Sequence, residues 1–127
     1  MATSWGVQMG KFSKEKGKRG ELYVVNKFKE YGYNNAHRTA QYKGNTGQAG
    51  DIEGIDYIHA EVKFVERLNL YEAIEQAKND SKFTLKKPTV FHKRSRDKLL
   101  VTMEFDDWID LYNSYYSDMK LGEYGHL

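Results

Sequence analysis

Apolar residues recur at helical spacing in three parts of the chain. The first such part predicts a helix over residues 17–31, which Gly32 ends. A second helix is predicted to begin after Asn69, because an asparagine followed three residues later by a glutamate is typical of a capping box. A mixed apolar and aromatic pattern predicts a third helix over residues 105–116.

Short runs of apolar and β-branched residues predict strands between these helices. The strands are expected over residues 36–42, 51–55, 57–65, 89–92 and 99–103. A glycine-containing loop over residues 42–51 leads into the second of them. The order helix, strands, helix, strands, helix favours an α/β or α+β domain, with one mixed sheet covered by helices.

Charged residues interrupt the hairpin predicted over residues 51–65. Side chains alternate faces along a strand, so Glu61 and Lys63 share one face. The hairpin returns Asp51 to the side of Glu61, and two convergent carboxylates are ligands that Mg²⁺ prefers. Lys63 beside them would stabilise charge on a phosphate or activate water, whereas an exposed Glu–Lys pair is the structural alternative. The other two acids of the hairpin, Glu53 and Asp56, are predicted to be surface residues.

The composition limits the class of protein. A chain of 127 residues with 39% hydrophobic residues fits one folded domain, preceded by a polar, flexible and basic arm over residues 1–15. The absence of cysteine excludes disulfides and zinc–thiolate sites. We expect a cytoplasmic protein with no membrane partner, because the sequence has neither a long apolar run nor the apolar segment of a signal peptide.

The net charge of +2 conceals an uneven distribution. Residues 11–29 hold seven Lys or Arg against two acids, and residues 82–98 hold seven against one. From residue 103 onward, six acids stand against one lysine. Two basic blocks and an acidic end favour a polyanion-binding face, and chance clustering on a solvated surface is the alternative.

Candidate contacts to a DNA backbone lie in both blocks. Three cations stand at the start of the first helix, where a phosphate is well placed, and four basic residues crowd the turn between the last two strands. These residues are Lys16, Lys18 and Arg19, and then His92, Lys93, Arg94 and Arg96. Arg38 is either a phosphate contact or a surface salt bridge, and the loop of Lys43 either wraps DNA or is a plain loop.

The remaining histidine and aromatic residues have simpler interpretations. His59 lies on the face of Glu61 and is predicted to be a hydrogen-bonded sheet histidine, with stacking near the acids as the alternative. The aromatic residues of the last helix are predicted to be core or dimer contacts. They are Trp108, Tyr112, Tyr115 and Tyr116.

The hairpin resembles a known nuclease signature. "GD", nine residues and then "EVK" is similar to the PD-(D/E)xK motif, with Gly50 where the motif has proline. This departure looks mild, because the proline shapes the turn and does not bind metal. The stretch "GKRGELYVVNKFKEYGYNNAHRTAQ" resembles the first helix and strand of archaeal-type and phage Holliday junction resolvases, with Glu21 and Arg38 at the family's glutamate and arginine.

A later stretch extends this resemblance. "HKRSRDKLLVTMEFDDWIDLY" is similar to the late strand, basic turn, strand and helix of phage-encoded members, so the resemblance spans roughly residues 16–116. It implies an α/β restriction-endonuclease-like core, in which a mixed β-sheet is flanked by helices. The nuclease domain would cover residues 16–118 and a tail residues 119–127.

The resemblance also implies an activity. The chain would be a homodimeric, Mg²⁺-dependent endonuclease, in which Mn²⁺ can substitute for Mg²⁺, that resolves four-way DNA junctions by paired symmetric cuts. Its setting would be the cytoplasm of a bacterial or archaeal host, and its origin a phage. Two cuts in a two-fold substrate explain why two copies are needed.

Residue roles follow from the same resemblance. The catalytic set would be Glu21, Asp51, Glu61 and Lys63. Asp51 and Glu61 would bind Mg²⁺, with the Val62 carbonyl as a possible further ligand, and Lys63 would orient or activate the attacking water. Glu21 would complete the metal shell directly or through water, unless it is a helix-surface acid beside the basic residues. Gln76 stands where the family has a polar residue on the next helix.

Three other functions remain open at this point. The same fold carries restriction- and repair-type nucleases with other DNA substrates. A catalytically silent DNA-binding module is a second alternative, which the complete set of three acids and a lysine disfavours. An RNA-processing or RNA-binding protein is a third, because basic blocks also suit RNA.

Overall fold

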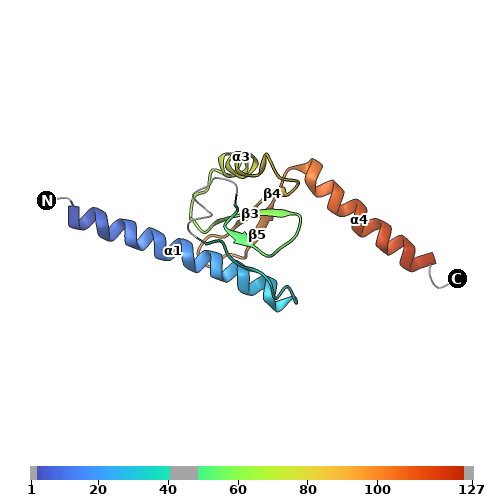
Figure 1. The fold of residues 1–127 in the computed structure, drawn as a ribbon, viewed down its shortest axis with the longest axis horizontal. Coiled ribbons are helices and arrows are strands. Elements are labelled where there is room, and N and C mark those ends of the chain that lie inside the picture. The colour runs from blue at the N-terminus through green and yellow to red at the C-terminus, as the bar shows by residue number, and fades with distance from the viewer. Residues whose placement is uncertain (1–2, 41–48, 125–127) are drawn as a thin grey trace.

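A computed structural model describes residues 3–40 and 49–124, with side chains described from residue 15 to 40 and from 49 to 122. The first half runs α1 (Thr3–Glu30), β1 (His37–Arg38), β2 (Ile52–Glu53) and β3 (Ile58–Lys63). The second half runs α3 (Leu70–Ser81), β4 (Lys87–His92), β5 (Leu100–Thr102) and α4 (Phe105–Tyr124). Figure 1 shows the sheet at the centre, with α4 extending away from it.

The five strands form one mixed sheet in the order β1-β2-β3-β4-β5. β3 and β4 are parallel, with Glu61 opposite Val90, and the other neighbouring strands are antiparallel. α3 connects the two parallel strands, as such a pair requires a crossover segment. The α/β class and the mixed sheet flanked by helices are therefore confirmed.

The two faces of the sheet are covered by different helices (Figure 1). Val24 and Val25 of α1 pack with Ala60 of β3 in one buried cluster. Ile74 of α3 packs with Val90 of β4 in a second cluster. Since strand side chains alternate, the positions of β3 next to Ala60 face α3, and these include His59 and Glu61. Both of these polar residues are buried.

The element boundaries differ from those predicted at both ends of the chain. α1 begins at Thr3 instead of near residue 17, so the segment predicted as an arm is helical from Thr3 onward. α4 continues to Tyr124 instead of ending at residue 116. The added turns are polar or mixed in sequence, so apolar periodicity gives no signal for them. Most of the predicted loop over residues 42–51 lies outside the described residues, and so does Lys43.

The helix start at Asn69 is confirmed. The Glu72 backbone N–H donates to Asn69 Oδ1 at 3.1 Å, which is the expected N-cap hydrogen bond. Ile74 and Ala77 are buried as the apolar stripe predicts. This cap fixes where α3 begins, and therefore which residues of its last turn reach the sheet.

A glycine shapes the turn between β2 and β3. Gly54 has φ +83°, and a Cβ there would lie 1.9 Å from the backbone oxygen of Asn35. Tyr57 completes the turn with φ +69°. Only glycine fits the Gly54 position without moving the backbone. The turn sets the register in which Ile52 pairs with Ala60.

The aromatic residues of α4 do not belong to the core of this chain. Trp108 and Tyr112 stack with ring centroids 5.3 Å apart, and Tyr116 continues the row at 6.2 Å. The side chains of Trp108, Tyr112, Tyr115 and Tyr116 are all exposed. The core interpretation is therefore wrong for this row, and dimer contact stays a prediction. None of the described helices is long and apolar enough to cross a membrane.

Candidate functional site

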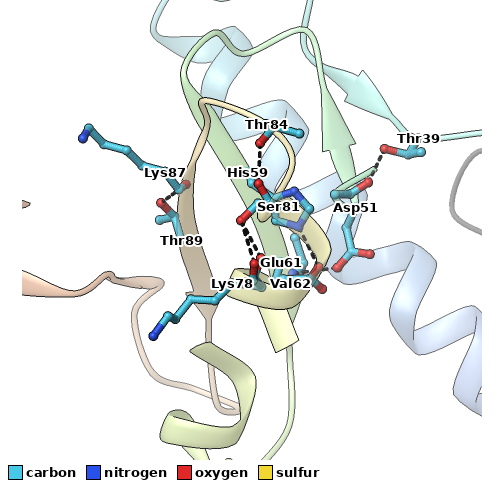
Figure 2. Close-up of polar contacts among 12 residues, drawn as sticks. Thr39, Asp51, His59, Glu61, Val62, Lys78, Ser81, Thr84, Lys87 and Thr89 are labelled. Carbon is cyan, nitrogen blue, oxygen red and sulfur yellow. Dashed lines mark hydrogen bonds and ion pairs between the residues drawn. The ribbon is translucent and has the colours of Figure 1, made fainter. Parts of the chain in front are cut away.

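The hairpin brings Asp51 to the side of Glu61, as its spacing predicts (Figure 2). The Asp51 backbone N–H donates to the Ala60 carbonyl at 2.7 Å. The Val62 backbone N–H donates to Asp51 Oδ2, also at 2.7 Å. Thr39 holds the segment from the other side, because its N–H donates to the Asp51 carbonyl and its hydroxyl to the Gly50 carbonyl. The Asp51 carboxylate is therefore fixed in position by the backbone of β3.

Gly50 is needed for this close approach of the two chain segments. It is buried, and a Cβ there would lie 2.7 Å from the Ala60 oxygen and 3.0 Å from the Ala60 nitrogen. A proline, the residue of the resembling motif, does not fit this backbone. The departure that looks mild in the sequence is therefore a constraint of the structure, since the segment before Asp51 packs directly on a peptide group of β3.

Two acids of the site, Asp51 and Glu21, have raised pKa values. Burial, followed by the Glu61 carboxylate, raises the pKa of Asp51 from 3.8 to about 6, although the Val62 N–H and Lys63 act in the opposite direction. Burial, followed by the charge of Asp51, also raises the pKa of Glu21, which Arg38 partly offsets. The structure thus brings the four residues of the predicted catalytic set into one electrostatic group. Their catalytic roles stay predictions.

Asp51→Asn is expected to stabilise the metal-free protein above about pH 6. A carboxyl whose folded pKa is raised contributes stability below its unfolded pKa, and this contribution is lost as pH rises through the folded value. The shift from 3.8 to about 6 sets the window, and an amide still accepts the Val62 N–H. The gain in unfolding free energy over wild type should grow by roughly 2 kcal/mol between about pH 4 and about pH 7.

Urea unfolding of both proteins across this window, with chelator present, measures that gain. Asp56→Asn is the matched control, because Asp56 is exposed in the turn of the same hairpin. A gain that does not change with pH, or one equal to that of the control, contradicts a raised pKa of Asp51.

Glu21 is held by an arginine at the edge of the site. Arg38 Nε donates to Glu21 Oε2 at 3.2 Å, and both side chains are partly buried. Of the two interpretations of Arg38, the structure shows the salt bridge. Glu21 is not among the carboxylates whose ligand atoms all lie within 4.8 Å of one another in the described residues. Asp51 is not in that group either, and a contribution of Glu21 to a metal shell stays a prediction.

Both basic blocks meet in one surface hollow. Lys16 and Arg19 of α1 line it together with Lys93 and Arg94, which precede β5. This basic hollow, defined by those four residues, has a volume of about 150 Å³ and Phe64 in its wall. The Lys93 ammonium lies 5.7 Å from the Tyr23 ring centroid and 6.0 Å from that of Phe64.

A single acid belongs to the basic hollow. Glu66 lines it and accepts a hydrogen bond from the Ser95 N–H at 3.0 Å. Four cations therefore stand against one carboxylate. A neighbouring hollow of about 320 Å³ is lined by Lys16 and by Lys63, so the basic surface continues to Lys63.

The other predicted contacts are placed less uniformly. His92 is partly buried, its Nε2 lies 2.8 Å from Thr102 Oγ1, and burial lowers its pKa, which disfavours its charged form; its DNA contact stays a prediction. Lys18 and Arg96 are exposed, and Arg96 has φ +66°. Arg94 pairs with Asp97 at 2.9 Å. Gln76 is exposed on α3 and lines neither hollow.

The structure adds residues that the sequence does not single out. Arg67 and Lys98 line a larger groove of about 710 Å³, which shares Lys93 and Arg94 with the basic hollow. Lys98 belongs to the second basic block, so the sequence could have singled it out by its charge alone. His59 is the predicted hydrogen-bonded sheet histidine, with its Nε2 3.1 Å from Glu61 Oε1. Asp80, on α3, joins this pair without any signal in the sequence.

No family model, curated protein or solved structure matches the chain. The function is therefore inferred from the chain's own residues, together with the order of motifs described above.

Proposed function

We propose that this chain is a metal-dependent endonuclease that cuts branched DNA, with the four-way junction as its preferred substrate. The observation that carries the proposal is the Asp51–Glu61 carboxylate pair, with Lys63 acting on the charge of Asp51. Nothing in the folding of a hairpin requires two acids to be buried together, because their mutual repulsion opposes folding. A restriction-endonuclease-like core, as the motif order implies, is part of the proposal.

The carboxylates suit a hard divalent cation. Mg²⁺ prefers carboxylate oxygens completed by water and phosphate, and Mn²⁺ accepts the same ligands. A cation between Asp51 and Glu61 would offset the burial cost and the repulsion that together raise the pKa of Asp51. The Val62 carbonyl would be a further ligand on the same strand, and Glu21 would complete the shell directly or through water. When bound, the metal would supply the Lewis acidity that phosphodiester hydrolysis needs.

The chain's own groups would do the remaining work. The Val62 N–H orients Asp51, and Arg38 orients Glu21. Lys63 shares the face of Glu61, where its ammonium would orient the attacking water or stabilise charge that develops on the phosphate. Glu21, Arg38 and Lys63 lie on a helix or strand, and Asp51 directly precedes β2, which suits the positional precision that catalysis needs.

The basic hollow supports a DNA substrate. Its four cations lie beside the hollow that Lys63 lines, so a backbone that crosses them would pass the acids. Phosphate contacts of this kind position a duplex without reading its sequence, which suits an enzyme that recognises DNA shape. The alternatives on the same fold are a restriction- or repair-type nuclease and a silent DNA-binding module.

A homodimer is the form in which we propose that the enzyme acts. A two-fold dimer presents two sites to a two-fold junction. The exposed aromatic row of α4 offers apolar surface that a second copy would cover. A phage origin and the cytoplasm of a prokaryotic host belong to the same proposal. Sedimentation of wild type and Trp108→Ala, with exposed Tyr71→Ala as control, tests the dimer.

Cleavage of a labelled four-way junction and of a matched linear duplex tests the function. With Mg²⁺, paired symmetric nicks in the junction and little cutting of the duplex are expected. Equal cutting of both would favour a restriction- or repair-type nuclease. Binding without cutting, in Mg²⁺ and in Mn²⁺, would mean that the enzyme proposal is wrong. A labelled RNA duplex of the same length tests the RNA alternative.

Removing cations of the basic hollow should weaken junction binding without abolishing cutting at saturation. Arg19→Ala and Arg94→Ala each remove one proposed phosphate contact, and each should reduce the slope of log affinity against log salt by about 1. The double variant should lose about 2, because the two contacts lie on separate segments.

Fluorescence anisotropy over a salt series measures these slopes. Lys29→Ala is the control, because it removes an exposed cation from the last turn of α1, which does not line the basic hollow. Slopes that match the control would place the DNA elsewhere on the surface.

A further inference from the structure

A second group of potential metal ligands lies on the α3 side of Glu61. It joins His59 and Glu61 of β3 with Asp80 from the last turn of α3. One ligand atom from each residue lies within 4.8 Å of the other two. Within the residues that the structure describes, no other three His, Asp or Glu side chains meet this condition. Figure 2 shows His59 and Glu61 side by side on β3, next to the end of α3.

The spacing of these atoms leaves room for an ion. His59 Nε2 and Glu61 Oε1 are 3.1 Å apart, whereas no ion pair joins Asp80 to either of them. A carboxylate oxygen of Asp80 nevertheless lies within 4.8 Å of a ligand atom of His59 and of Glu61. Nitrogen and oxygen ligands bind divalent transition metals at about 2.0–2.2 Å, so two ligands of one ion lie roughly 3–4.4 Å apart. The gap between Asp80 and the buried pair is thus close to the span of one ion.

The charges at this place favour a cation. The side chains of His59 and Glu61 are 1% and 5% exposed, so their charges are poorly solvated. Asp80 adds a second carboxylate in the last turn of α3, where the helix dipole already disfavours negative charge. Among the described residues, Asp80 makes no hydrogen bond or ion pair that would offset this cost.

We propose that His59, Glu61 and Asp80 bind a divalent transition-metal ion, of the class of Mn²⁺, Co²⁺ and Zn²⁺, at a site that shares Glu61 with the Asp51 site. The imidazole nitrogen decides the class of ion. Mg²⁺ prefers oxygen ligands alone, whereas imidazole suits the transition metals. The all-oxygen Asp51 site would therefore prefer Mg²⁺, and the site with the imidazole would prefer Co²⁺ or Zn²⁺, while Mn²⁺ suits both.

The site does not depend on nuclease activity. It uses Asp80 and His59, which have no role in the proposed cleavage, and it lies against α3 instead of against Asp51. Binding there would fix the orientation of Glu61, which is the one residue that both sites use. A metal-free cluster, in which His59 is simply hydrogen-bonded to Glu61 with Asp80 nearby, is the competing account of the same three residues.

Titration of the chelator-treated, full-length protein with Co²⁺ separates these two accounts. Calorimetry measures the affinity, and the visible spectrum reports whether protein ligands have replaced water. Asp80→Asn and His59→Gln should each weaken Co²⁺ binding roughly 100-fold or more and remove the spectral change. Asp118→Asn and His37→Gln, at exposed positions, should leave both unchanged.

Asp80→Asn is the decisive variant, because Asp80 is only partly buried and its change disturbs no described hydrogen bond. His59→Gln is informative only if its circular dichroism matches that of wild type. If Asp80→Asn binds Co²⁺ as tightly as the controls and gives the same spectrum, the proposal is overturned and the cluster is metal-free.

Asp51→Asn makes this result independent of the proposed function. It should stop junction cutting while keeping the Co²⁺ spectrum, since Asp51 is not a ligand of this site. If wild type cuts junctions but Asp80→Asn binds Co²⁺ as tightly as wild type, only the metal-site proposal is contradicted. If the Co²⁺ spectrum depends on Asp80 but wild type never cuts DNA, only the nuclease proposal is contradicted.

Discussion

Asp51→Asn is expected to lower the rate of junction cutting roughly a thousandfold or more, while junction binding changes less than about threefold. Asp51 and Glu61 are the only acids of the hairpin that lie together and buried or partly buried, and a divalent cation between them needs both charges. The amide keeps the hydrogen bond from the Val62 N–H, so the hairpin stays in place. The basic hollow is untouched, and binding therefore persists.

Single-turnover cleavage with saturating enzyme measures the rate, and anisotropy measures the binding. Glu61→Gln should show the same pattern, because it removes the other carboxylate of the pair. Asp56→Asn, in the exposed turn of the hairpin, should cut like wild type. A variant without Asp51 that still cuts within tenfold of wild type would show that the carboxylate pair is not the centre of catalysis.

The loss of activity should accompany a gain in stability. Burial, followed by the charge of Glu61, disfavours the ionised form of Asp51, and an amide or a bound metal removes this cost. A protein that keeps two acids together at such a cost, with no metal present, gains stability when either acid is neutralised. The opposite signs of the two effects in one variant separate a functional site from a structural one.

The sequence predicts the arrangement of the hairpin well, and for a simple reason. Alternation along a strand sets which residues share a face, and a tight turn fixes which residues pair across strands. Asp51 beside Glu61 follows from these two rules alone, and so does the burial of Ala60 on the opposite face. The start of α3 follows equally from local chemistry, since Asn69 and Glu72 satisfy the cap by themselves.

Features that depend on packing between distant segments are not predicted. Asp80 reaches His59 only because α3 lies across β3, and its sequence neighbours give no sign of this. The two basic blocks are visible as separate runs, but their convergence depends on α1 packing against Phe64. There, a Cβ on Gly20 would lie 3.0 Å from the Phe64 ring. Glycine is likewise needed at position 50 only because the Ala60 peptide packs against it, and the sequence does not show this contact.

Lys63→Gln is expected to lower the cutting rate roughly 100-fold and to move the pH dependence of the remaining activity upward. Lys63 lowers the pKa of Asp51, so its removal leaves burial and Glu61 less opposed and raises that pKa above about 6. Asp51 must be deprotonated to bind a metal ion. The acidic limb of the pH–rate profile should therefore shift to higher pH, which a purely structural lysine would not cause.

Single-turnover rates across the pH range, at saturating metal and enzyme, give both quantities for wild type and Lys63→Gln. Lys98→Gln is the matched control, because Lys98 lines the groove beside the basic hollow and is not among the groups that act on Asp51. It should weaken binding at most, and leave the acidic limb in place. An unchanged limb in Lys63→Gln would mean that Lys63 does not set the charge of Asp51. A full rate would remove Lys63 from the catalytic set, and the Asp51–Glu61 pair would then have to act with Glu21 and the basic hollow alone.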